Sequence, residues 1–464
     1  MAKKIRTLKI GISGVRGIIG ESLSPTVIIR FAQAYGTYIR GGRVVVGRDT
    51  RTSGDMVKYG IFSGLLSCGC EIIDLGVCPV PTLQLMLTQL QCDGGVMITA
   101  SHNPVEWNAL KFFSREGVYL NNEQFSYLVD IYHQGEFRKV GEQEYKNIIY
   151  NAEGVKIHIK RILDNLPNLQ EIRKRRFRVV LDACNGAGAV STPYLLKELN
   201  CDLIPINIVP DGVFPRNPEP LPKNLIQAST AVKQTSADVG FAQDADADRL
   251  AIIDEKGNPI SEEFTIAIII NSFLRRTANK SNMEEKPVVV VNLSTTKAID
   301  DIAAKYNAKV VRSKVGEINV VEAMKRNDAI VGGEGNGGVI IPQIVYGRDS
   351  LSAIAYVLSE LAELNCRVSE LVSNLPHYEM LKEKISCPTD KIFTIINKTK
   401  ELYSQYQIDT TDGVKIIFGG DAWLHIRPSN TEPVLRIIAE AADSQKASQV
   451  VSEYKRKIAS LLEK

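Results

Sequence analysis

The sequence predicts an α/β protein with three similar α/β domains, built on mixed sheets between helices, and a C-terminal α+β domain. Short apolar runs alternate with helical segments, the order of these runs occurs three times, and each repeat ends in a polar loop rich in small residues. Apolar runs separated by helices are typical of parallel or mixed sheets whose faces are covered by helices. The residues after 372 follow a different order, which predicts a separate domain.

Each repeat contains three apolar runs. They lie at 43–49, 71–76 and 95–98 in the first repeat, at 178–182, 202–206 and 238–242 in the second, and at 288–291, 309–311 and 329–331 in the third. A fourth run follows each third run at once, at 110–113, 250–253 and 339–341. Because α/β sheets commonly place ligand groups where strands end, the loops after the third runs are candidate binding loops.

The sequence pattern of the C-terminal region predicts three strands and two helices. Helical periodicity covers 391–405 and 444–462, and the strands are expected at 414–418, 423–426 and 434–441. We expect the four domains to span residues 1–152, 153–257, 258–372 and 373–464.

The composition argues against several classes of protein. The 464 residues carry a net charge of +3, which is too balanced to indicate a nucleic-acid partner. The N-terminus lacks the apolar region of a signal peptide, and no apolar run approaches the ~18 residues of a membrane span. The 8 cysteines form no CxxC pair, which favours reduced thiols over a metal cluster. We therefore expect a cytoplasmic protein without a membrane partner.

The segment DADADR places three carboxylates at Asp244, Asp246 and Asp248. In an extended segment these side chains share one face, and such close anions repel one another unless a cation binds them. Oxygen ligands suit Mg²⁺ or Ca²⁺. An EF-hand is rejected because Arg249 stands where that loop needs glycine, and a solvated acidic turn is disfavoured because an apolar strand follows at once. An open Mg²⁺ site is the predicted role.

The segment GGEGNGG, residues 332–338, has the glycine spacing of a dinucleotide-binding loop, but an apolar strand follows where that loop needs a helix. Its glycines allow a ligand to approach the backbone closely. Glu334 and Asn336 offer acceptor and donor groups for sugar hydroxyls. A simple β-turn stays open as the alternative.

The segment RPSNTEP combines a guanidinium with polar side chains and a turn of backbone N–H groups. Arg427 precedes Ser429, Asn430 and Thr431, and Arg436 follows on the next predicted strand. Guanidinium groups, hydroxyls and a nest of N–H groups are typical of a phosphate site.

The segment TASHNP contains Ser101, a candidate nucleophile. Glycine is absent on both sides of this serine, so it lacks a nucleophile elbow, and the neighbouring His102 would point away from it in an extended segment. A serine hydrolase is therefore disfavoured. If the loops after the third strands converge, Ser101 meets the carboxylates and a metal, which points to phosphoryl transfer through a phosphoserine.

These four loops occur in the order TASHNP, DADADR, GEGNGG and RPSNTEP, and together with GISGVRGIIG and GRDTRTSG they resemble the α-D-phosphohexomutase family over the whole chain. The resemblance implies three like α/β domains and a fourth domain around a central cleft. It also implies that the four domains carry, in order, the phosphoserine, the metal site, sugar recognition and phosphate binding.

The resemblance further implies roles for single residues. Ser101 would carry the phosphoryl group and, with the three aspartates, hold Mg²⁺. Arg16 and Lys111 match family positions with proton-transfer or transition-state roles. We also predict that His102 is catalytic, and that Lys111 is the general base because neighbouring cations lower its pKa. The residues that would contact the substrate are Arg249, Lys314, Glu334, Asn336, Arg427, Ser429, Asn430, Thr431 and Arg436.

The chain departs from the family pattern at several positions. Ala245 and Ala247 stand in the metal loop and Ala109 stands before Lys111 where glycine is common, and the sugar loop has Asn336 and Gly338 where serine and histidine are usual. The form GGEGNGG followed by YGRD resembles phosphoglucosamine mutases of the archaeal type.

The predicted function is an isomerase, an intramolecular phosphotransferase of carbohydrate metabolism. It would interconvert glucosamine 6-phosphate and glucosamine 1-phosphate through a hexose 1,6-bisphosphate, for amino-sugar nucleotide biosynthesis, as a monomer or homodimer. The alternatives are a phosphomannomutase or phosphoglucomutase of the same mechanism, a Mg²⁺-dependent sugar-phosphate phosphatase with an aspartate nucleophile, and a non-catalytic protein that binds sugar phosphate or Ca²⁺.

Overall fold

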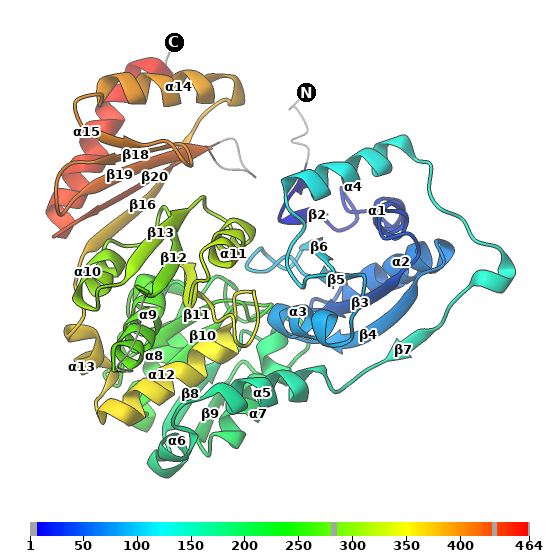
Figure 1. Cartoon of the computed structure of the whole chain (residues 1–464), viewed down its shortest axis with the longest axis horizontal. Helices are drawn as coiled ribbons and strands as arrows, with labels where there is room; N and C mark the ends of the chain where they lie inside the picture. Colours follow the sequence, from blue (N-terminus) through cyan, green and yellow to red (C-terminus); the bar gives the residue numbers. More distant parts are fainter. Residues whose placement is uncertain (1–6, 280–284, 429–433, 463–464) are drawn as a thin grey trace. The chain divides into compact units, whose positions relative to one another are not determined.

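The computed structural model describes residues 7–279, 285–428 and 434–462. Its strands and helices follow the predicted α/β order, with a C-terminal α+β region (Figure 1). The chain divides into two compact units, Met1–Thr265 with Asn336–Leu371, and Ile266–Gly335 with Val372–Lys464. Among the described residues, no helix is both long and apolar enough to cross a membrane. The 8 cysteines are all free thiols.

The first sheet is mixed, as predicted. Its strands are β1 (Lys9–Gly11), β2 (Gly14–Ile18), β3 (Arg43–Arg48), β4 (Glu71–Val77), β5 (Gly94–Ile98), β6 (Trp107–Ser114) and β7 (Ile148–Tyr150). They lie in the order β1-β2-β6-β5-β3-β4-β7. Strands β3, β4, β5 and β7 are parallel, whereas β6 pairs antiparallel with both β5 and β2. The serine loop lies between β5 and β6.

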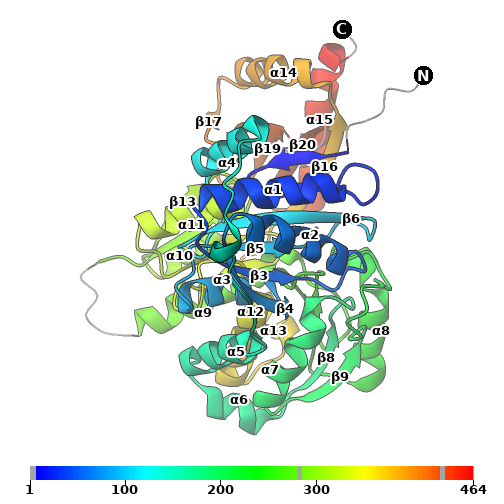
Figure 2. The same ribbon diagram turned by 90° about the vertical axis from the view of Figure 1, so that its right-hand side faces the viewer.

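Helices cover both faces of the first sheet (Figures 1 and 2). They are α1 (Pro25–Tyr38), α2 (Gly54–Ser67), α3 (Val80–Gln89) and α4 (Asn122–Gln134). Helix α1 packs against α2 and α4, and α3 packs against β3 and β5. Successive strand residues point to opposite faces, so Val44 and Val46 join the core that includes α1 and α2, whereas Val45 lies on the side of Leu83 in α3.

The second sheet is also mixed and carries the carboxylate loop. Its strands are β8 (Arg178–Asp182), β9 (Asp202–Ile206), β10 (Val239–Gln243) and β11 (Leu250–Ile253), in the order β11-β10-β8-β9. Strands β8, β9 and β10 are parallel, and β11 returns antiparallel along β10. Helices α7 (Thr192–Glu198) and α8 (Ile226–Thr235) pack against these strands. Helices α5 (Gly154–Asn165) and α6 (Leu169–Arg175) pack against α3 and α12 (Ser350–Leu364), respectively, and the single turns are η1 (Glu142–Glu144), which precedes β7, η2 (Ala187–Val190) and η3 (Pro222–Asn224).

The third repeat contributes to both units. Its first three strands, β12 (Val288–Asn292), β13 (Lys309–Ser313) and β14 (Val331–Glu334), are parallel in the order β13-β12-β14. Helices α10 (Ala298–Lys305) and α11 (Glu317–Arg326) pack against them. The first unit holds β15 (Gly338–Ile340) and α12 (Ser350–Leu364), which packs against α5 and α6. Helix α9 (Glu262–Ala278) precedes β12 in the chain, and α13 (Val368–Ser373) follows α12.

The C-terminal region is an antiparallel sheet with helices packed against it. Its strands are β16 (Glu379–Ser386), β17 (Gln407–Asp409), β18 (Val414–Ile417), β19 (Trp423–Pro428) and β20 (Val434–Ala441), in the order β16-β20-β19-β18-β17. Helices α14 (Thr389–Leu402) and α15 (Ser444–Leu462) pack against these strands. Alternate residues such as Ile416, Leu424 and Ile437 form its apolar core.

Sequence periodicity did not predict every strand. Strand β16 was missed because Lys382, Glu383 and Lys384 interrupt its apolar pattern, and β1, β2, β7 and β17 are short or contain glycine. In each case the neighbouring strand, rather than a local apolar run, completes the backbone pairing.

Tyr35 joins α1 to the central strands of the first sheet. Its buried hydroxyl donates to the carbonyl oxygen of Phe113 at 2.6 Å and accepts from the N–H group of Gly95 at 2.9 Å. This single oxygen therefore serves one backbone group on β6 and one on β5, and burial raises the pKa of the phenol well above its ordinary value.

We expect Tyr35→Phe to lower the free energy of unfolding by about 1–3 kcal/mol, because the N–H group of Gly95 loses its acceptor in a buried place. Tyr38→Phe on the same helix is the matched control, since the Tyr38 hydroxyl makes no hydrogen bond within the described part of the chain. Urea unfolding of both variants measures the difference. Equal losses in the two variants would contradict this role of Tyr35.

Candidate active site

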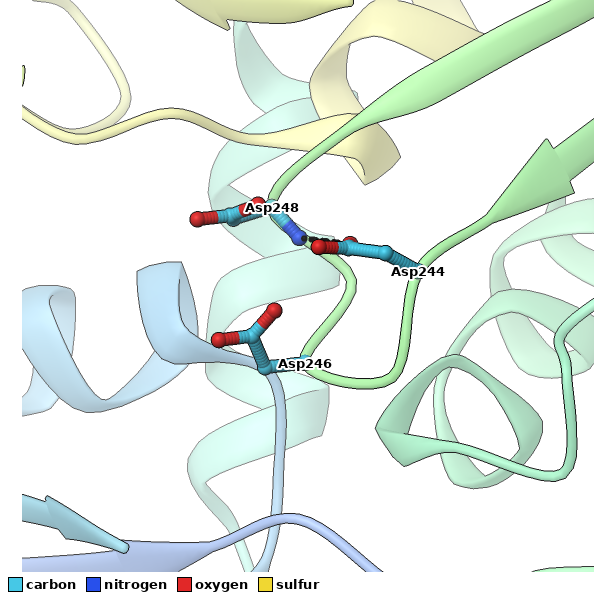
Figure 3. A group of neighbouring side chains, drawn as sticks. All are labelled: Asp244, Asp246 and Asp248. Atoms are coloured by element: carbon cyan, nitrogen blue, oxygen red, sulfur yellow. Dashed lines mark hydrogen bonds between the residues drawn. The ribbon is translucent and has the colours of Figure 1, made fainter. Parts of the chain in front are cut away.

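The three carboxylates converge on a turn, so the expectation of an extended segment is wrong (Figure 3). Strand β11 pairs antiparallel with β10, and the chain must therefore reverse between Gln243 and Leu250. Ala247 adopts the left-handed conformation with φ of 55° inside this turn. The turn brings one oxygen of each of Asp244, Asp246 and Asp248 within 4.8 Å of the others.

Backbone and hydroxyl groups hold the turn in place. The N–H groups of Asp248 and Arg249 both donate to Asp244 Oδ1 at 3.2 Å. Ser350 Oγ donates to the carbonyl oxygen of Ala247 at 2.6 Å. The N–H group of Val80 donates to the carbonyl oxygen of Asp246 at 3.1 Å. The turn is thus connected to the N-terminal ends of α12 and α3.

Two cations compensate two of the three carboxylates. Lys111 Nζ lies 2.8 Å from Asp246 Oδ2, and Arg348 Nη2 lies 2.5 Å from Asp248 Oδ2. Burial would raise the pKa of Asp246, but the ion pair with Lys111 outweighs it and holds that pKa below its usual range. Burial and the carboxylates of Asp248 and Asp246 raise the pKa of Asp244 well above its ordinary value.

This cluster fits a hard divalent cation. Asp246 Oδ1 and Asp248 Oδ1 are buried and have no hydrogen-bond partner among the described residues. Unpaired buried carboxylate oxygens are costly unless a cation approaches them, and oxygen-only ligands suit Mg²⁺. The residues that could hold a metal are therefore the three aspartates, with an oxygen carried by Ser101 beside them.

Ser101 lies directly beside the carboxylates. The residue is 7 % exposed, and its Oγ donates to Asp244 Oδ2 at 2.9 Å. Its backbone has φ of 50°, and its N–H group donates to Thr99 Oγ1 at 3.0 Å. Because the segment is a turn, the expected divergence of the two neighbouring side chains is wrong: His102 Nδ1 lies 3.4 Å from Ser101 Oγ.

Arg51, which sequence reasoning missed, holds the serine loop. Its fully buried guanidinium donates to four carbonyl oxygens of this loop, those of Ser101, Asn103, Pro104 and Trp107, at 2.6 to 3.0 Å. Its Nε also pairs with Asp49 Oδ2 at 3.1 Å. The segment GRDTRTSG contains this pair, but the sequence alone does not indicate that an arginine between two threonines is buried.

The other predicted catalytic groups line the same loop. Arg16 Nη1 donates to Asn103 Oδ1 at 3.0 Å. Burial, together with the cations of Arg249 and Arg16, lowers the pKa of His102 well below its ordinary value. The expectation of a lowered pKa for Lys111 is wrong: burial would lower it, but Asp246 outweighs burial and raises the pKa of the ammonium above its ordinary value.

Arg249 and Asn336 also lie in the first unit. Arg249 Nε is 3.8 Å from Asp248 Oδ1, which is an ion pair rather than a hydrogen bond. The side chain of Asn336 accepts from the N–H group of Gly338 at 3.2 Å, and the N–H group of Leu250 donates to the carbonyl oxygen of Gly337 at 3.0 Å. The end of the sugar loop therefore runs along the start of β11.

Of the seven further predicted residues in the second unit, four lie in the described part of the chain. Glu334 is buried and its Oε1 accepts from Asn292 Nδ2 and from the N–H group of Gly316, each at 2.9 Å. Lys314, two residues before Gly316, is exposed. Arg427 and Arg436 lie on β19 and β20, whereas Ser429, Asn430 and Thr431 fall outside the described residues.

Arg427 and Arg436 place two guanidinium groups side by side in the second unit, where the carboxylates of Asp412 and Glu334 also act on Arg427. They stand directly opposite each other in the antiparallel β19–β20 pair, and Lys384 stands opposite Arg436 on β16. Like charges at such positions destabilise a sheet unless an anion lies near them. Arg427 Nε is buried without a hydrogen-bond partner among the described residues. Gly413 packs closely against β19, since a Cβ there would lie 2.3 Å from the carbonyl oxygen of Ile426 and 2.9 Å from Arg427 Cβ.

Comparisons with known proteins identify the family. Domain profiles described as Phosphoglucomutase/phosphomannomutase match in order: alpha/beta/alpha domains I, II and III at residues 7–139, 156–257 and 262–378, and the C-terminal domain at 363–457. A "Phosphoglucomutase/phosphomannomutase" of Thermococcus kodakarensis is 41% identical over 452 residues, which cover 95% of this chain and 96% of the relative. The chain belongs to the phosphoglucomutase/phosphomannomutase family.

Further relatives of this family agree in sequence and fold. A "Probable phosphoglucosamine mutase" of Methanopyrus kandleri is 35% identical over 451 residues, which cover 96% of each chain. A solved structure of a phosphoglucomutase/phosphomannomutase family protein from Burkholderia thailandensis superposes with a TM-score of 0.83 at 23% identity, covering 97% of this chain and 98% of that one. The latter likeness concerns the fold alone.

Membership in the phosphoglucomutase/phosphomannomutase family confirms the predicted class of enzyme. The chain is a phosphohexomutase, an isomerase that acts as an intramolecular phosphotransferase. The family is generally metal-dependent, and the aspartate turn supplies an acidic cluster for a metal.

The alanines of the metal loop allow a direct test of the turn. We expect Ala247→Gly to unfold at a higher temperature than Ala245→Gly, because a left-handed alanine costs roughly 1–2 kcal/mol that glycine avoids, whereas Ala245 is not left-handed. Both methyl groups are fully buried, so the loss of packing is similar in the two variants. Calorimetry of the metal-free proteins gives both Tm values, and the reverse order would contradict the turn geometry.

Proposed function

We propose that this phosphohexomutase interconverts glucosamine 6-phosphate and glucosamine 1-phosphate through phosphorylated Ser101 and a hexose 1,6-bisphosphate. The observation that carries the proposal is the 2.9 Å hydrogen bond from Ser101 Oγ to Asp244 Oδ2. This contact puts the candidate phosphate-carrying oxygen beside three buried carboxylates that suit a divalent cation. A phosphoryl group on serine next to such a cation is the arrangement that phosphoryl transfer requires.

The proposed metal is Mg²⁺, held by Asp244, Asp246, Asp248 and an oxygen of phosphorylated Ser101. When bound, Mg²⁺ would neutralise negative charge on the oxygens of the transferring phosphoryl group. Asp246 Oδ1 and Asp248 Oδ1, which have no hydrogen-bond partner among the described residues, support this assignment.

Two phosphoryl transfers complete the proposed cycle. The bond between phosphorus and Ser101 Oγ breaks as phosphorus bonds to the free hydroxyl oxygen of the sugar phosphate, and the hydroxyl proton passes to a base. The 1,6-bisphosphate then presents its other phosphoryl group, which returns to Ser101 Oγ while the departing sugar oxygen takes up a proton. Arg16, His102 and Lys111 are the proposed catalytic groups, because they line the serine loop or pair with the carboxylates.

The remaining predicted residues are proposed to bind the substrate. Because the two phosphates exchange places, one distal site must accept a phosphate at either end of the sugar. The opposed pair Arg427 and Arg436 supports this role, and Ser429, Asn430 and Thr431 are proposed to complete the site. Arg249, Lys314, Glu334 and Asn336 are proposed to contact the sugar or its phosphates.

The sugar assignment has support from relatives and from Glu334. Relatives named probable phosphoglucosamine mutase match at 34–35% identity over nearly the whole chain. The carboxylate of Glu334 would pair with a 2-ammonium group of glucosamine as well as accept from hydroxyls. The relative at 41% identity carries the name phosphoglucomutase/phosphomannomutase, which favours glucose or mannose phosphate as the second candidate.

Several broader assignments accompany this function. We propose phosphoserine, metal-binding, sugar-recognition and phosphate-binding domains at residues 1–152, 153–257, 258–372 and 373–464. The proposed partners are small hexose phosphates in the cytoplasm, and the protein is proposed to be a monomer or homodimer. In contrast, a phosphatase with an aspartate nucleophile would use water as the acceptor and would not need Ser101.

We expect Ser101→Ala to abolish nearly all mutase turnover, because it removes the only side-chain hydroxyl that donates to Asp244 in the described structure. Purified wild-type protein should be partly phosphorylated on the peptide that contains Ser101, as mass spectrometry would detect. The control variant Ser404→Ala alters an exposed serine and should keep both turnover and phosphorylation. Normal turnover of Ser101→Ala would contradict the phosphoserine mechanism. A phosphatase would release phosphate from the substrate in both Ser101→Ala and Ser404→Ala.

A panel of substrates tests the sugar assignment. We expect kcat/KM to be highest for glucosamine phosphate when the 1- and 6-phosphates of glucosamine, glucose and mannose are compared under the same conditions. One favourable charge pair to the ammonium group is worth roughly 1.4 kcal/mol or more, which corresponds to about tenfold in kcat/KM. If glucose or mannose phosphate were preferred by that factor, the sugar assignment would be wrong, although the mutase mechanism would stand.

A further inference from the structure

Gly338, the first residue of β15, leaves a space that the side chain of Arg348 fills. A Cβ atom at residue 338 would lie 2.3 Å from Arg348 Cδ and 3.0 Å from Arg348 Cγ. The backbone of Gly338 is not left-handed, so its conformation does not require glycine. The close approach of the arginine side chain is therefore the reason why a larger residue does not fit here.

The backbone at Arg348 is held by its neighbour, Asp349. The N–H group of Asp349 donates to the carbonyl oxygen of Val339 at 2.8 Å, which joins the start of α12 to β15. The Asp349 carboxylate caps α12 by accepting from the N–H group of Leu351 at 3.0 Å, and its other oxygen lies 3.0 Å from His158 Nε2. These contacts fix the position from which the Arg348 side chain extends.

The guanidinium of Arg348 is directed at one oxygen of one carboxylate. Arg348 Nη2 donates to Asp248 Oδ2 at 2.5 Å, and both side chains are buried or nearly so. Asp248 Oδ1 makes no hydrogen bond among the described residues, since Arg249 Nε approaches it only to 3.8 Å. The arginine therefore occupies one oxygen of Asp248 and leaves the other available.

The three carboxylates are compensated in different ways. Lys111 pairs with Asp246, whereas Asp244 accepts from the Ser101 hydroxyl and from backbone N–H groups. Among the described residues, Arg348 is the cation that lies within hydrogen-bonding distance of Asp248, whereas Arg249 stays at 3.8 Å. Removal of one partner from a buried ion pair leaves an uncompensated charge, which is strongly destabilising.

We propose that Arg348 is the internal counter-ion of the carboxylate turn, and that Gly338 is the residue that admits its side chain. Arg348 acts through Asp248 and is therefore a positioning residue: its guanidinium holds the Asp248 carboxylate in place and compensates its charge while no metal is bound. The inference rests on the proposed metal site. It predicts that loss of the guanidinium destabilises the metal-free protein and strengthens binding of a divalent cation, because the cation then supplies the missing positive charge.

A double-mutant cycle of Gly338→Ala and Arg348→Met tests the proposal. Calorimetric titration of the metal-free full chain with Mn²⁺ at pH 8 measures affinity, and scanning calorimetry in EDTA measures Tm. We expect Arg348→Met to bind Mn²⁺ on the order of tenfold more tightly and to have a lower metal-free Tm. Gly338→Ala displaces the guanidinium and should shift both quantities in the same direction, with little further change when it is added to Arg348→Met.

Two matched variants separate charge from packing. Arg348→Lys keeps the cation and should restore Mn²⁺ affinity toward that of the wild type. Gly11→Ala adds a methyl group at a glycine with nothing within 4 Å of its Cβ position, and should change neither quantity. Unchanged or weaker Mn²⁺ binding by Arg348→Met, or fully additive effects in the cycle, would overturn the counter-ion role alone. Failure of the wild type to bind Mn²⁺ would overturn the metal site and this inference together.

Discussion

The first unit depends on the repulsion among three fully buried carboxylates. One oxygen of each carboxylate lies within 4.8 Å of one oxygen of the others. Buried like charges are stable only when cations or hydrogen-bond donors face them. Strand β6 supplies Lys111, the segment before α12 supplies Arg348, and the loop after β5 supplies the Ser101 hydroxyl. Elements that are distant in sequence are therefore joined at the turn by charge as well as by apolar packing.

The serine loop places its hydroxyl beside the carboxylates because a second buried charge, Arg51, holds the loop backbone. The Arg51 guanidinium binds four carbonyl oxygens of the loop and the carboxylate of Asp49. Thr99 Oγ1 donates to Asp49 Oδ2 at 2.6 Å and accepts from the N–H group of Ser101. The left-handed backbone of Ser101 is thus supported on both sides, which keeps its Oγ directed at Asp244. The second unit shows the opposite arrangement, in which Arg427 and Arg436 face each other and favour an anion.

Much of the fold was predictable because buried strands have a local signature. The three repeats of apolar runs agree with strands β3 to β6, β8 to β11 and β12 to β15, and the antiparallel return strands β6 and β11 follow the two loops that carry Ser101 and the aspartates. Strand β16 was not predictable in this way, because its lysines face away from the core and its pairing with β20 replaces an apolar pattern.

The sequence by itself determined the chemistry of this protein: a serine loop, three carboxylates two residues apart, and the order of loops that resembles phosphohexomutases. Tertiary structure alone decided how these groups act on one another. The turn at Ala247, the raised pKa of Lys111 and the burial of Arg51 and Arg348 all depend on residues far away in the chain. Local patterns specify which side chains are present, but electrostatic effects depend on distance and burial, which only the packed chain sets.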